Sequence, residues 1–523
     1  MTNKLFVART ALIVALGGFL MGFDASVISG VVKFIELEFS LTKLQLGWAV
    51  SSLTLTATLA MMAAGPLSDA IGRRKVLYGA AVLYAVSAIG SAIAPTFWFL
   101  VVARMIGGLG VGASLIIAPM YIAEIAPPQM RGQLVSFNQL NIVVGISVAF
   151  FTNYLILQLG KSEAVWAQEL MFGPYNWRWM LGLETLPAVL YFFSLFAVPE
   201  SPRWLVMKGR DAEGLAIMTR ASGAEDARKD LVTVKASLAK DAHKEKARLS
   251  VLFAPAMRLV LLIGIVIAVI QQITGINAVF FYAPMIFEQS GIGTDASFVQ
   301  AILVGIINLV FTVVAISLVD RLGRKPLLVF GLSGITIAMI VLAFGFYSAT
   351  YTLTPEALAS LPEEVPVEQL STLEGQTFGQ DVAYKTALRE TLGHSTAQQF
   401  ESELITAAIR MNPALILFGI LGFVASFAVS TGPVMWVLFS ELFPNRVRGL
   451  AISFVGLINS SISFLVQLVF PWELDNFGSA LTFLLYGVFA ALGLIFVLKV
   501  LPETKGKSLE ELESILVQDQ SPH

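Results

Sequence analysis

Amide side chains gather in one apolar stretch of the sequence. Gln271, Gln272 and Asn277 lie there with Gly275, between long runs of Leu, Ile, Val and Phe. An amide buried among apolar groups is costly unless it is hydrogen-bonded. Each amide has donors and acceptors, so it can bind the hydroxyl groups of a ligand or hydrogen-bond to a neighbouring helix. The residues therefore predict either a polar binding site or a structural hydrogen-bond network.

Two helix breaks are predicted near candidate binding residues. A straight helix turns by about 100° per residue and would place Gln272 and Asn277 about 140° apart. Gly275 lies between them and can interrupt the helix, so we expect the two amides to converge. Gly432-Pro433 predicts a second break. Trp436 follows that pair and offers a flat apolar face with one N–H donor.

Asp24 lies inside the first apolar run and Arg104 lies inside the fourth. Ionisable groups within membrane segments are rare and usually functional. Desolvation favours the protonated carboxyl and a nearby cation favours the carboxylate, so a group balanced between them can bind and release a proton. The alternative is a static Asp24–Arg104 ion pair that orders the helices.

The elements that must position these residues are membrane-spanning helices. Only 13% of the 523 residues are charged, against about 25% in soluble domains. About 20 apolar residues span the hydrocarbon as one helix. The sequence predicts an all-α membrane protein with twelve such helices, at residues 8–31, 45–68, 76–94, 97–121, 134–158, 177–198, 257–287, 297–319, 326–349, 412–440, 449–470 and 477–499.

Basic residues in the short loops predict the orientation. If the helices alternate in direction, these residues all fall on one side, which the positive-inside rule makes cytoplasmic, together with both termini. The net charge of −2 gives no indication of nucleic-acid binding, and the absence of cysteine excludes disulfides and thiolate metal sites. We expect no cofactor, no metal and no catalytic site. The basic loop residues are Arg73, Arg74, Lys75, Arg131, Arg321, Arg324, Lys325, Arg446 and Arg448.

The sequence contains an internal repeat. Asp69-x-x-Gly72-Arg73 is repeated at Asp320-x-x-Gly323-Arg324, 251 residues later, whereas Glu124-x6-Arg131 is repeated at Glu441-x6-Arg448, 317 residues later. The larger second offset predicts an insertion in the second half. We therefore expect an N-terminal bundle at 1–198, a cytoplasmic linker at 199–256, a C-terminal bundle at 257–500 with an external insertion at 350–411, and a cytoplasmic tail at 501–523.

Charged residues at the predicted cytoplasmic helix ends form matched acidic and basic sets. Exposed ion pairs contribute only about 0–1 kcal/mol each, but a network can bias two conformations. We expect these residues to pair across the two halves and to act as a gate, whereas simple anchoring would explain only the basic ones. The set comprises Asp69, Arg73, Arg74, Glu124, Arg131, Glu200, Arg203, Asp320, Arg324, Glu441, Arg448 and Glu503.

These motifs together resemble the sugar porter family of the major facilitator superfamily. The resemblance covers nearly the whole chain except 350–411. It is carried by the loop from Gly65 to Arg74, although Ala70 departs from the usual basic residue. More specific are the motifs that begin at Pro199, at Pro502 and at Gln271: Pro-Glu-Ser-Pro-Arg-Trp, Pro-Glu-Thr-Lys-Gly and Gln-Gln-x-x-Gly-x-Asn.

The resemblance implies a secondary active transporter that imports a monosaccharide by alternating access. It implies that Asp24 and Arg104 form a proton-coupling pair, since facilitative relatives tend to have an uncharged residue at the Asp24 position. The implied partners are a sugar, protons and the lipid bilayer, and the implied functional state is a monomer in the bacterial inner membrane. The positions that match sugar-contacting ones are Gln139, Gln271, Gln272, Asn277, Tyr282, Asn308, Trp436 and Asn459.

The residues leave alternatives open. A facilitative sugar carrier would use Asp24 only structurally. A transporter-like sugar sensor would be expected to have a long cytoplasmic tail, and 502–523 is short. Ser460 stands where most family members have a second Trp, and Met21 stands where an aromatic residue is frequent. The pocket is therefore expected to be wider, or refilled by neighbours such as Phe454 or Phe464, which leaves the sugar open.

Overall fold

The computed structural model describes residues 4–242, 249–444 and 447–505. In this part of the chain, twelve segments are long and apolar enough to cross a membrane, which confirms the twelve predicted helices. Helix by helix, they are α1 (Lys4–Glu38), α2 (Lys43–Ile71), α3 (Arg73–Ala92), α4 (Phe97–Ile125), α5 (Pro128–Gly160), α7 (Asn176–Gly182) with α8 (Thr185–Ser194) and η1 (Leu195–Ala197), η3 (Pro255–Met257) and α12 (Arg258–Ile273) with α13 (Ile276–Glu288), α14 (Gly293–Leu322), α15 (Arg324–Tyr347), α21 (Pro413–Val429) with α22 (Thr431–Leu442), α23 (Arg448–Asn476) and α24 (Gly478–Val500).

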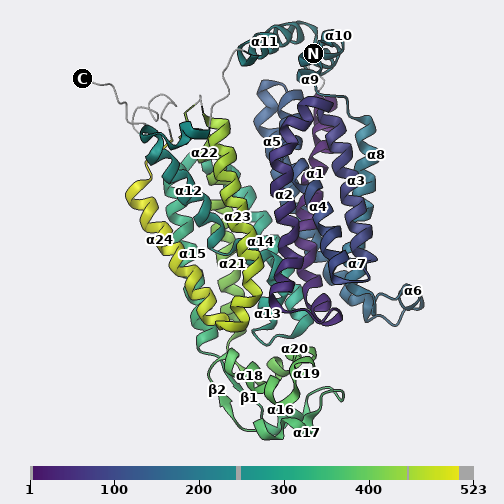
Figure 1. Cartoon of the computed structure of the whole chain (residues 1–523), viewed down its shortest axis with the longest axis vertical. Coiled ribbons are helices and arrows are strands. Elements are labelled where there is room, and N and C mark those ends of the chain that lie inside the picture. Colours follow the sequence, from purple (N-terminus) through teal and green to yellow (C-terminus); the bar gives the residue numbers. More distant parts are fainter. Residues whose placement is uncertain (1–3, 243–248, 445–446, 506–523) are drawn as a thin grey trace. The chain divides into compact units, whose positions relative to one another are not determined.

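Shorter elements connect these helices (Figure 1). A short helix follows α5, and three helices with a 3-10 turn form the linker after η1. The remaining elements belong to the predicted insertion. The short helix after α5 is α6 (Val165–Glu169). The elements after η1 are α9 (Pro202–Met207), α10 (Asp211–Ser222), α11 (Ala224–Ala242) and η2 (Leu249–Phe253). The insertion holds β1 (Thr350–Thr352), α16 (Pro355–Ala359), α17 (Val367–Leu370), η4 (Ser371–Leu373), β2 (Thr377–Phe378), α18 (Asp381–Leu392), α19 (His394–Gln399), α20 (Glu401–Ala408) and β3 (Ile409–Arg410).

The chain divides into two compact units. Among the described residues, unit 1 takes those of Met1–Ser26, Ser52–Ala149 and Arg178–Arg248, and unit 2 takes the rest. The division at Arg248 falls within the linker predicted at 199–256, while residues 506–523 of the predicted tail lie outside the described residues. Unit 1 has its own apolar core, in which Tyr84, Tyr121 and Tyr191 are fully buried.

Unit 2 also contains parts of the first six-helix repeat. The ends of α1, α2 and α5 on the side of the insertion, here called the outer ends, belong to it as Val27–Ser51 and the segment from Phe150. Within unit 2, a Cβ on Gly47 of α2 would lie 1.9 Å from the carbonyl oxygen of Leu468 in α23. The backbones of α2 and α23 therefore touch here, an approach that only glycine permits.

The insertion is a small folded body. Strand β1 lies between β2 and β3 and pairs antiparallel with both. Its core contains Tyr351 and Tyr384, whose rings stack with centroids 5.2 Å apart. Helix α18 contributes Tyr384 and Leu388 to this core. Strand β1 follows α15 and β3 precedes α21, so the segment lies between these two helices.

Candidate functional site

The predicted break at Gly275 is confirmed. Helix α12 ends at Ile273, and Gly275 adopts a left-handed conformation with φ 93° before α13 begins. This region favours glycine, and a Cβ here would also lie 2.4 Å from the ring of Tyr486. The break lets Asn277 Nδ2 donate to Gln272 Oε1 at 2.8 Å. The two amides therefore converge as expected.

Asn459 of α23 connects these amides to a third helix. Its Nδ2 donates to Gln271 Oε1 at 2.7 Å and to the carbonyl of Ala268 at 2.9 Å, and its Oδ1 accepts from Gln272 Nε2 at 3.2 Å. Gln271, Gln272 and Asn459 are buried. The amide cluster, defined as Gln271, Gln272, Asn277 and Asn459, thus satisfies its own buried groups, as buried amides require. The same donors and acceptors can exchange to ligand hydroxyls.

Tyr282 and Asn308 lie in unit 2 but differ in surroundings. Tyr282 is fully buried, its hydroxyl donates to the carbonyl of Gln467 at 2.8 Å, and its ring packs 5.2 Å from that of Phe470. Its backbone at φ −125°, ψ 17° adds a kink within α13. Asn308 is buried in α14. The Tyr282 hydroxyl is therefore engaged with α23 in this conformation.

Trp436 follows the second break, which the structure places at Ser430 between α21 and α22. Trp436 is 44% exposed, and its ring packs edge-on against that of Phe439 at a centroid distance of 6.0 Å. An exposed indole face beside a helix break can contact the C–H face of a ring-shaped ligand. Gln139 belongs to unit 1, where its side chain on α5 is exposed.

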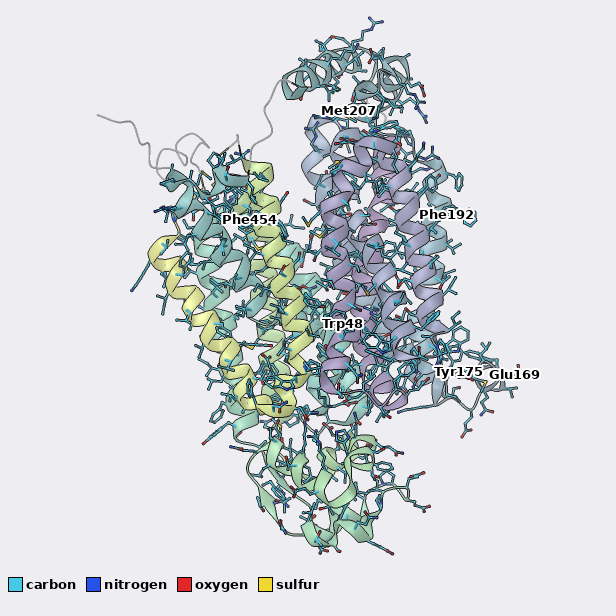
Figure 2. All side chains as sticks on the ribbon, in the orientation of Figure 1. Trp48, Glu169, Tyr175, Phe192, Met207 and Phe454 are labelled. Atoms are coloured by element: carbon cyan, nitrogen blue, oxygen red, sulfur yellow. The ribbon has the colours of Figure 1, made fainter. Side chains whose placement is uncertain are left out.

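The aromatic residues that were expected to refill the space near Ser460 have other partners. Phe454 packs edge-on against Phe253 at 5.6 Å, and Phe464 packs edge-on against Trp48 at 5.7 Å. Figure 2 shows Phe454 and Trp48 at different heights of unit 2. Ser460 itself is half-buried. These two contacts hold Phe454 and Phe464 against other aromatic rings.

In unit 1, Asp24 of α1 and Arg104 of α4 are both about 1% exposed. Arg104 Nη1 donates to Asp24 Oδ1 at 3.4 Å. The other oxygen, Asp24 Oδ2, is buried without a hydrogen-bond partner among the described residues. Gly107 makes room for it, because a Cβ there would lie 2.8 Å from Asp24 Oδ2. The expected pair exists, and its contact is long for a charge-assisted hydrogen bond.

Glu184 is a third buried charge, which the sequence patterns above did not single out. It precedes α8, is 2% exposed, and interacts electrostatically with both Asp24 and Arg104. Its Oε1 has no hydrogen-bond partner among the described residues. The signal was present, because Glu184 lies inside the sixth apolar run. Asp24 and Arg104 are therefore part of a group of three, with two carboxyls and one guanidinium.

The helix ends of unit 1 that lie opposite the outer ends are here called the inner ends. They carry a compact ionic cluster. Arg73 donates through Nε and Nη2 to Glu124 at 3.1 Å each, and through Nη1 to Asp69 at 2.7 Å. Glu200 Oε1 accepts from the backbone N–H of Arg74 at 3.1 Å, which caps α3. Charge-assisted pairs of this kind are the strong ones.

Unit 2 repeats this arrangement at its own inner helix ends. Arg324 donates through Nε at 3.1 Å and through Nη2 at 2.6 Å to Glu441. Glu503 accepts from the backbone N–H groups of Arg324 and Lys325 at 3.1 and 3.0 Å, which caps α15. Both clusters therefore join residues of one repeat, and the expected pairing across the halves stays a prediction.

The remaining members of the predicted gate differ in their exposure and in their contacts. Arg131 is exposed and Arg203 is half-buried. Arg448 donates through Nε to the carbonyl of Phe443 at 3.1 Å. The side chain of Asp320 lies outside the described residues. The best-defined parts of the predicted gate are therefore the two arginines at the starts of α3 and α15, each with its acidic partners.

Comparison with known proteins extends over nearly the whole chain. The family model described as "Sugar (and other) transporter" matches residues 10–358 and 399–516, and so skips 359–398 within the insertion. The arabinose-proton symporter of Bacillus subtilis is 35% identical over 98% of this chain and 95% of its own length. The D-xylose-proton symporter of Escherichia coli is 33% identical over 98% and 96%.

Solved structures give the same result. The xylose transporter of E. coli in a partially occluded inward open conformation has a TM-score of 0.73 and 31% sequence identity, and the match covers 97% of this chain and 100% of that chain. The prediction of a twelve-helix major facilitator fold is confirmed by this match.

Proposed function

Since the chain belongs to the sugar porter family of the major facilitator superfamily, we propose that it imports a monosaccharide together with protons by alternating access. The proposed substrate is a hexose or a pentose. This choice is supported by its similarity to an arabinose-proton symporter and a D-xylose-proton symporter.

The buried group of Asp24, Arg104 and Glu184 carries the proposal of proton coupling. Two carboxylates and one guanidinium in an apolar environment leave one negative charge unbalanced when all three are ionised. A buried charge without a partner is strongly unfavourable, and binding of one proton removes it. Arg104 can then balance the remaining carboxylate. The group is therefore suited to hold one proton and to release it when water reaches the site.

The amide cluster is the proposed sugar site in unit 2. Its amides can exchange hydrogen bonds among themselves for hydrogen bonds to sugar hydroxyls, and the break at Gly275 is what brings Gln272 and Asn277 together. Tyr282, Asn308 and Trp436 are proposed to complete the site within unit 2, and Gln139 of unit 1 stays a proposed sugar contact. A competition series with monosaccharides in proteoliposomes would identify the preferred sugar.

Asp24→Asn tests the proposed coupling. The variant keeps the size of the side chain and cannot release a proton, so sugar accumulation driven by a proton gradient should fall to the level of a control without a gradient. Sugar counterflow, which needs no net proton movement, should persist. Both can be measured with radiolabelled sugar in proteoliposomes.

Glu356→Gln is the matched control, because Glu356 is an exposed acid of the insertion. It should accumulate sugar like the parent protein. Unchanged uphill accumulation in Asp24→Asn would refute the coupling role and favour the facilitative alternative, in which Asp24 and Arg104 form a static pair.

The proposed setting is the inner membrane of a bacterium, with both termini in the cytoplasm and a monomer as the functional unit. Under this orientation the two inner clusters face the cytoplasm. They are proposed to stabilise one of the two transport conformations and to rearrange when the cytoplasmic side opens.

A further inference from the structure

The insertion contacts helices of both repeats, and all of these contacts lie within unit 2. On the second-repeat side, Arg389 of α18 forms an ion pair with Asp475 of α23, and Asp381 Oδ2 accepts from the N–H of Ser479 at the start of α24 at 2.8 Å. Glu401 of α20 accepts from Gln289, just after α13, at 3.3 Å. These contacts fix the insertion to the second repeat.

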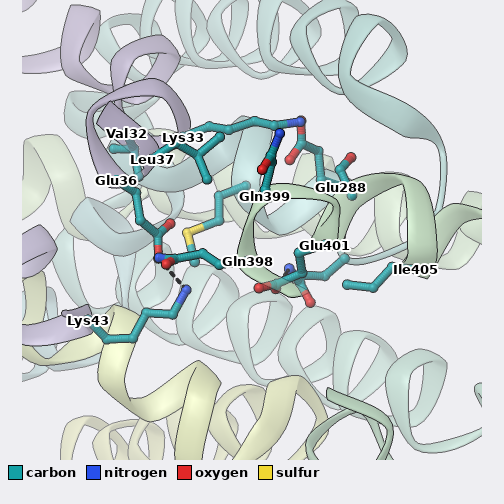
Figure 3. A pocket seen from close by; sticks show the side chains of 13 residues that line it. Val32, Lys33, Glu36, Leu37, Lys43, Glu288, Gln398, Gln399, Glu401 and Ile405 are labelled. Atoms are coloured by element: carbon teal, nitrogen blue, oxygen red, sulfur yellow. Dashed lines mark hydrogen bonds and ion pairs between the residues drawn. The ribbon is translucent and has the colours of Figure 1, made fainter. Parts of the chain in front are cut away.

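On the first-repeat side the contact is much smaller. Gln398 Nε2 at the end of α19 donates to Glu36 Oε1 of α1 at 2.9 Å. The same oxygen accepts from Lys43 Nζ of α2 at 2.5 Å, and Lys43 also interacts electrostatically with Glu401. Figure 3 shows this contact within a pocket where side chains of α1, α2, α13 and the insertion meet. Glu36 is therefore held simultaneously from α2 and from the insertion.

Other outer contacts close the same side of unit 2. Lys33 of α1 forms an ion pair with Glu288 of α13 at 3.2 Å, and Lys161 after α5 forms one with Asp295 of α14 at 2.5 Å. Alternating access requires the outer ends of α1, α2 and α5 to separate from the second repeat when the outside opens. The bond from Gln398 to Glu36 would then have to break, while the contacts to Asp475 and Ser479 need not change.

We infer that residues 350–411 form an external latch, which moves with the second repeat and stabilises the outside-closed conformation through the hydrogen bond from Gln398 to Glu36. The latch rests on the proposed alternating-access function and adds a means of regulating it. A folded body anchored on one repeat can prolong the closed state by one directed contact to the other. Such a contact biases a two-state equilibrium by its differential free energy.

The test measures opening directly. Because the chain has no cysteine, Leu44→Cys on α2 and Val299→Cys on α14 can be introduced without background, at positions that are 51% and 41% exposed. Spin labels at these sites report the outer distance by double electron–electron resonance. In Gln398→Ala, the population at longer distance should rise roughly threefold to tenfold, as expected for loss of one part-buried hydrogen bond.

Gln399→Ala is the control, because Gln399 lines the same pocket and is exposed. It should leave the distance distribution unchanged. In a Glu36→Ala background, Gln398→Ala should have no further effect, since both act through one bond. An unchanged distribution in Gln398→Ala, an equal shift in Gln399→Ala, or full additivity with Glu36→Ala would each overturn the latch. The measurement needs neither sugar nor protons, so its failure is distinguishable from failure of the proposed transport.

Discussion

At the scale of single residues, Gly275 determines whether the amide cluster can form. Its φ of 93° is a conformation that side chains with a Cβ rarely adopt, and the Tyr486 ring occupies the space that a Cβ would need. We predict that Gly275→Ala lowers stability by at least about 1–2 kcal/mol, the cost of the left-handed conformation alone. It should also slow counterflow strongly, because Gln272 and Asn277 separate.

Gly79→Ala provides the comparison. Gly79 lies within α3 and is exposed, and the space that a Cβ would take there has no neighbouring atom within 4 Å. Alanine is favoured over glycine in a helix interior, so this variant should unfold at the same temperature or slightly higher. Thermal unfolding in detergent and counterflow in proteoliposomes measure both variants. Equal behaviour of the two would show that the break does not depend on Gly275.

Residue types alone identify part of the site. Asp24 and Arg104 stand out because each interrupts an apolar run, and Glu184 does the same without having been singled out. What no residue type could show is that Glu184 lies close enough to interact with both. That depends on the packing of α1, α4 and the start of α8, which brings together residues that are 80 and 160 positions apart.

At the scale of elements, the repeat motifs have a shared structural reason. Gly72 precedes α3 with φ 107°, and Gly323 precedes α15 with φ 100°. A Cβ at either position would lie 2.4 or 2.9 Å from an oxygen of Glu200 or Glu503 respectively. Each glycine therefore lets a distant glutamate cap the next helix. The sequence predicted matched motifs at these helix ends, but not that each acid serves the helix of its own repeat.

The insertion offers a prediction about pH. Burial alone would raise the pKa of Glu401, but Lys385 and Lys43 outweigh it, and the pKa lies well below its ordinary value of 4.5. Lys385 Nζ is 3.2 Å from Glu401 Oε1. A lowered folded-state pKa gives stability that is complete above the unfolded value and is lost as the pH falls below it.

We therefore expect Glu401→Gln to lower the unfolding temperature by a similar amount throughout the range from pH 8 to about 5.5. Below about pH 4.5 the difference from the parent protein should shrink, because the unfolded parent chain then binds a proton at Glu401 that the folded protein does not bind. Glu390→Gln on α18, where the side chain is exposed, should differ little from the parent at any pH. A constant difference down to pH 3 would contradict this assignment.

At the scale of the whole molecule, hydropathy was sufficient for the spanning helices. Each span needs only length and apolar composition, so all twelve could be predicted, and the unequal repeat offsets indicated an insertion in the second half. Contacts between distant segments could not. Gln398 and Glu36 are separated by 362 positions, and neither is unusual in type. Their contact follows from how the folded insertion is mounted on α23 and α24.

Removal of the insertion separates its role from that of the transport sites. Strands β1 and β3 pair with Tyr351 opposite Ile409, so residues 353–407 can be replaced by Asn-Gly, which favours a tight hairpin turn. Counterflow should persist, because the amide cluster and the buried group of Asp24, Arg104 and Glu184 lie outside this segment. The family model likewise skips 359–398.

Two costs are expected from this deletion. Helix α24 loses its cap from Asp381, worth about 1 kcal/mol, which should lower the unfolding temperature slightly. The outer distance between labels at Leu44→Cys and Val299→Cys should shift further toward the open state than in Gln398→Ala, because Lys43 loses Glu401 as well. A folded deletion variant that keeps the parent distance distribution would show that the outer helix ends close without the insertion. A folded variant that opens but no longer exchanges sugar would mean that closure of the outside is needed for turnover.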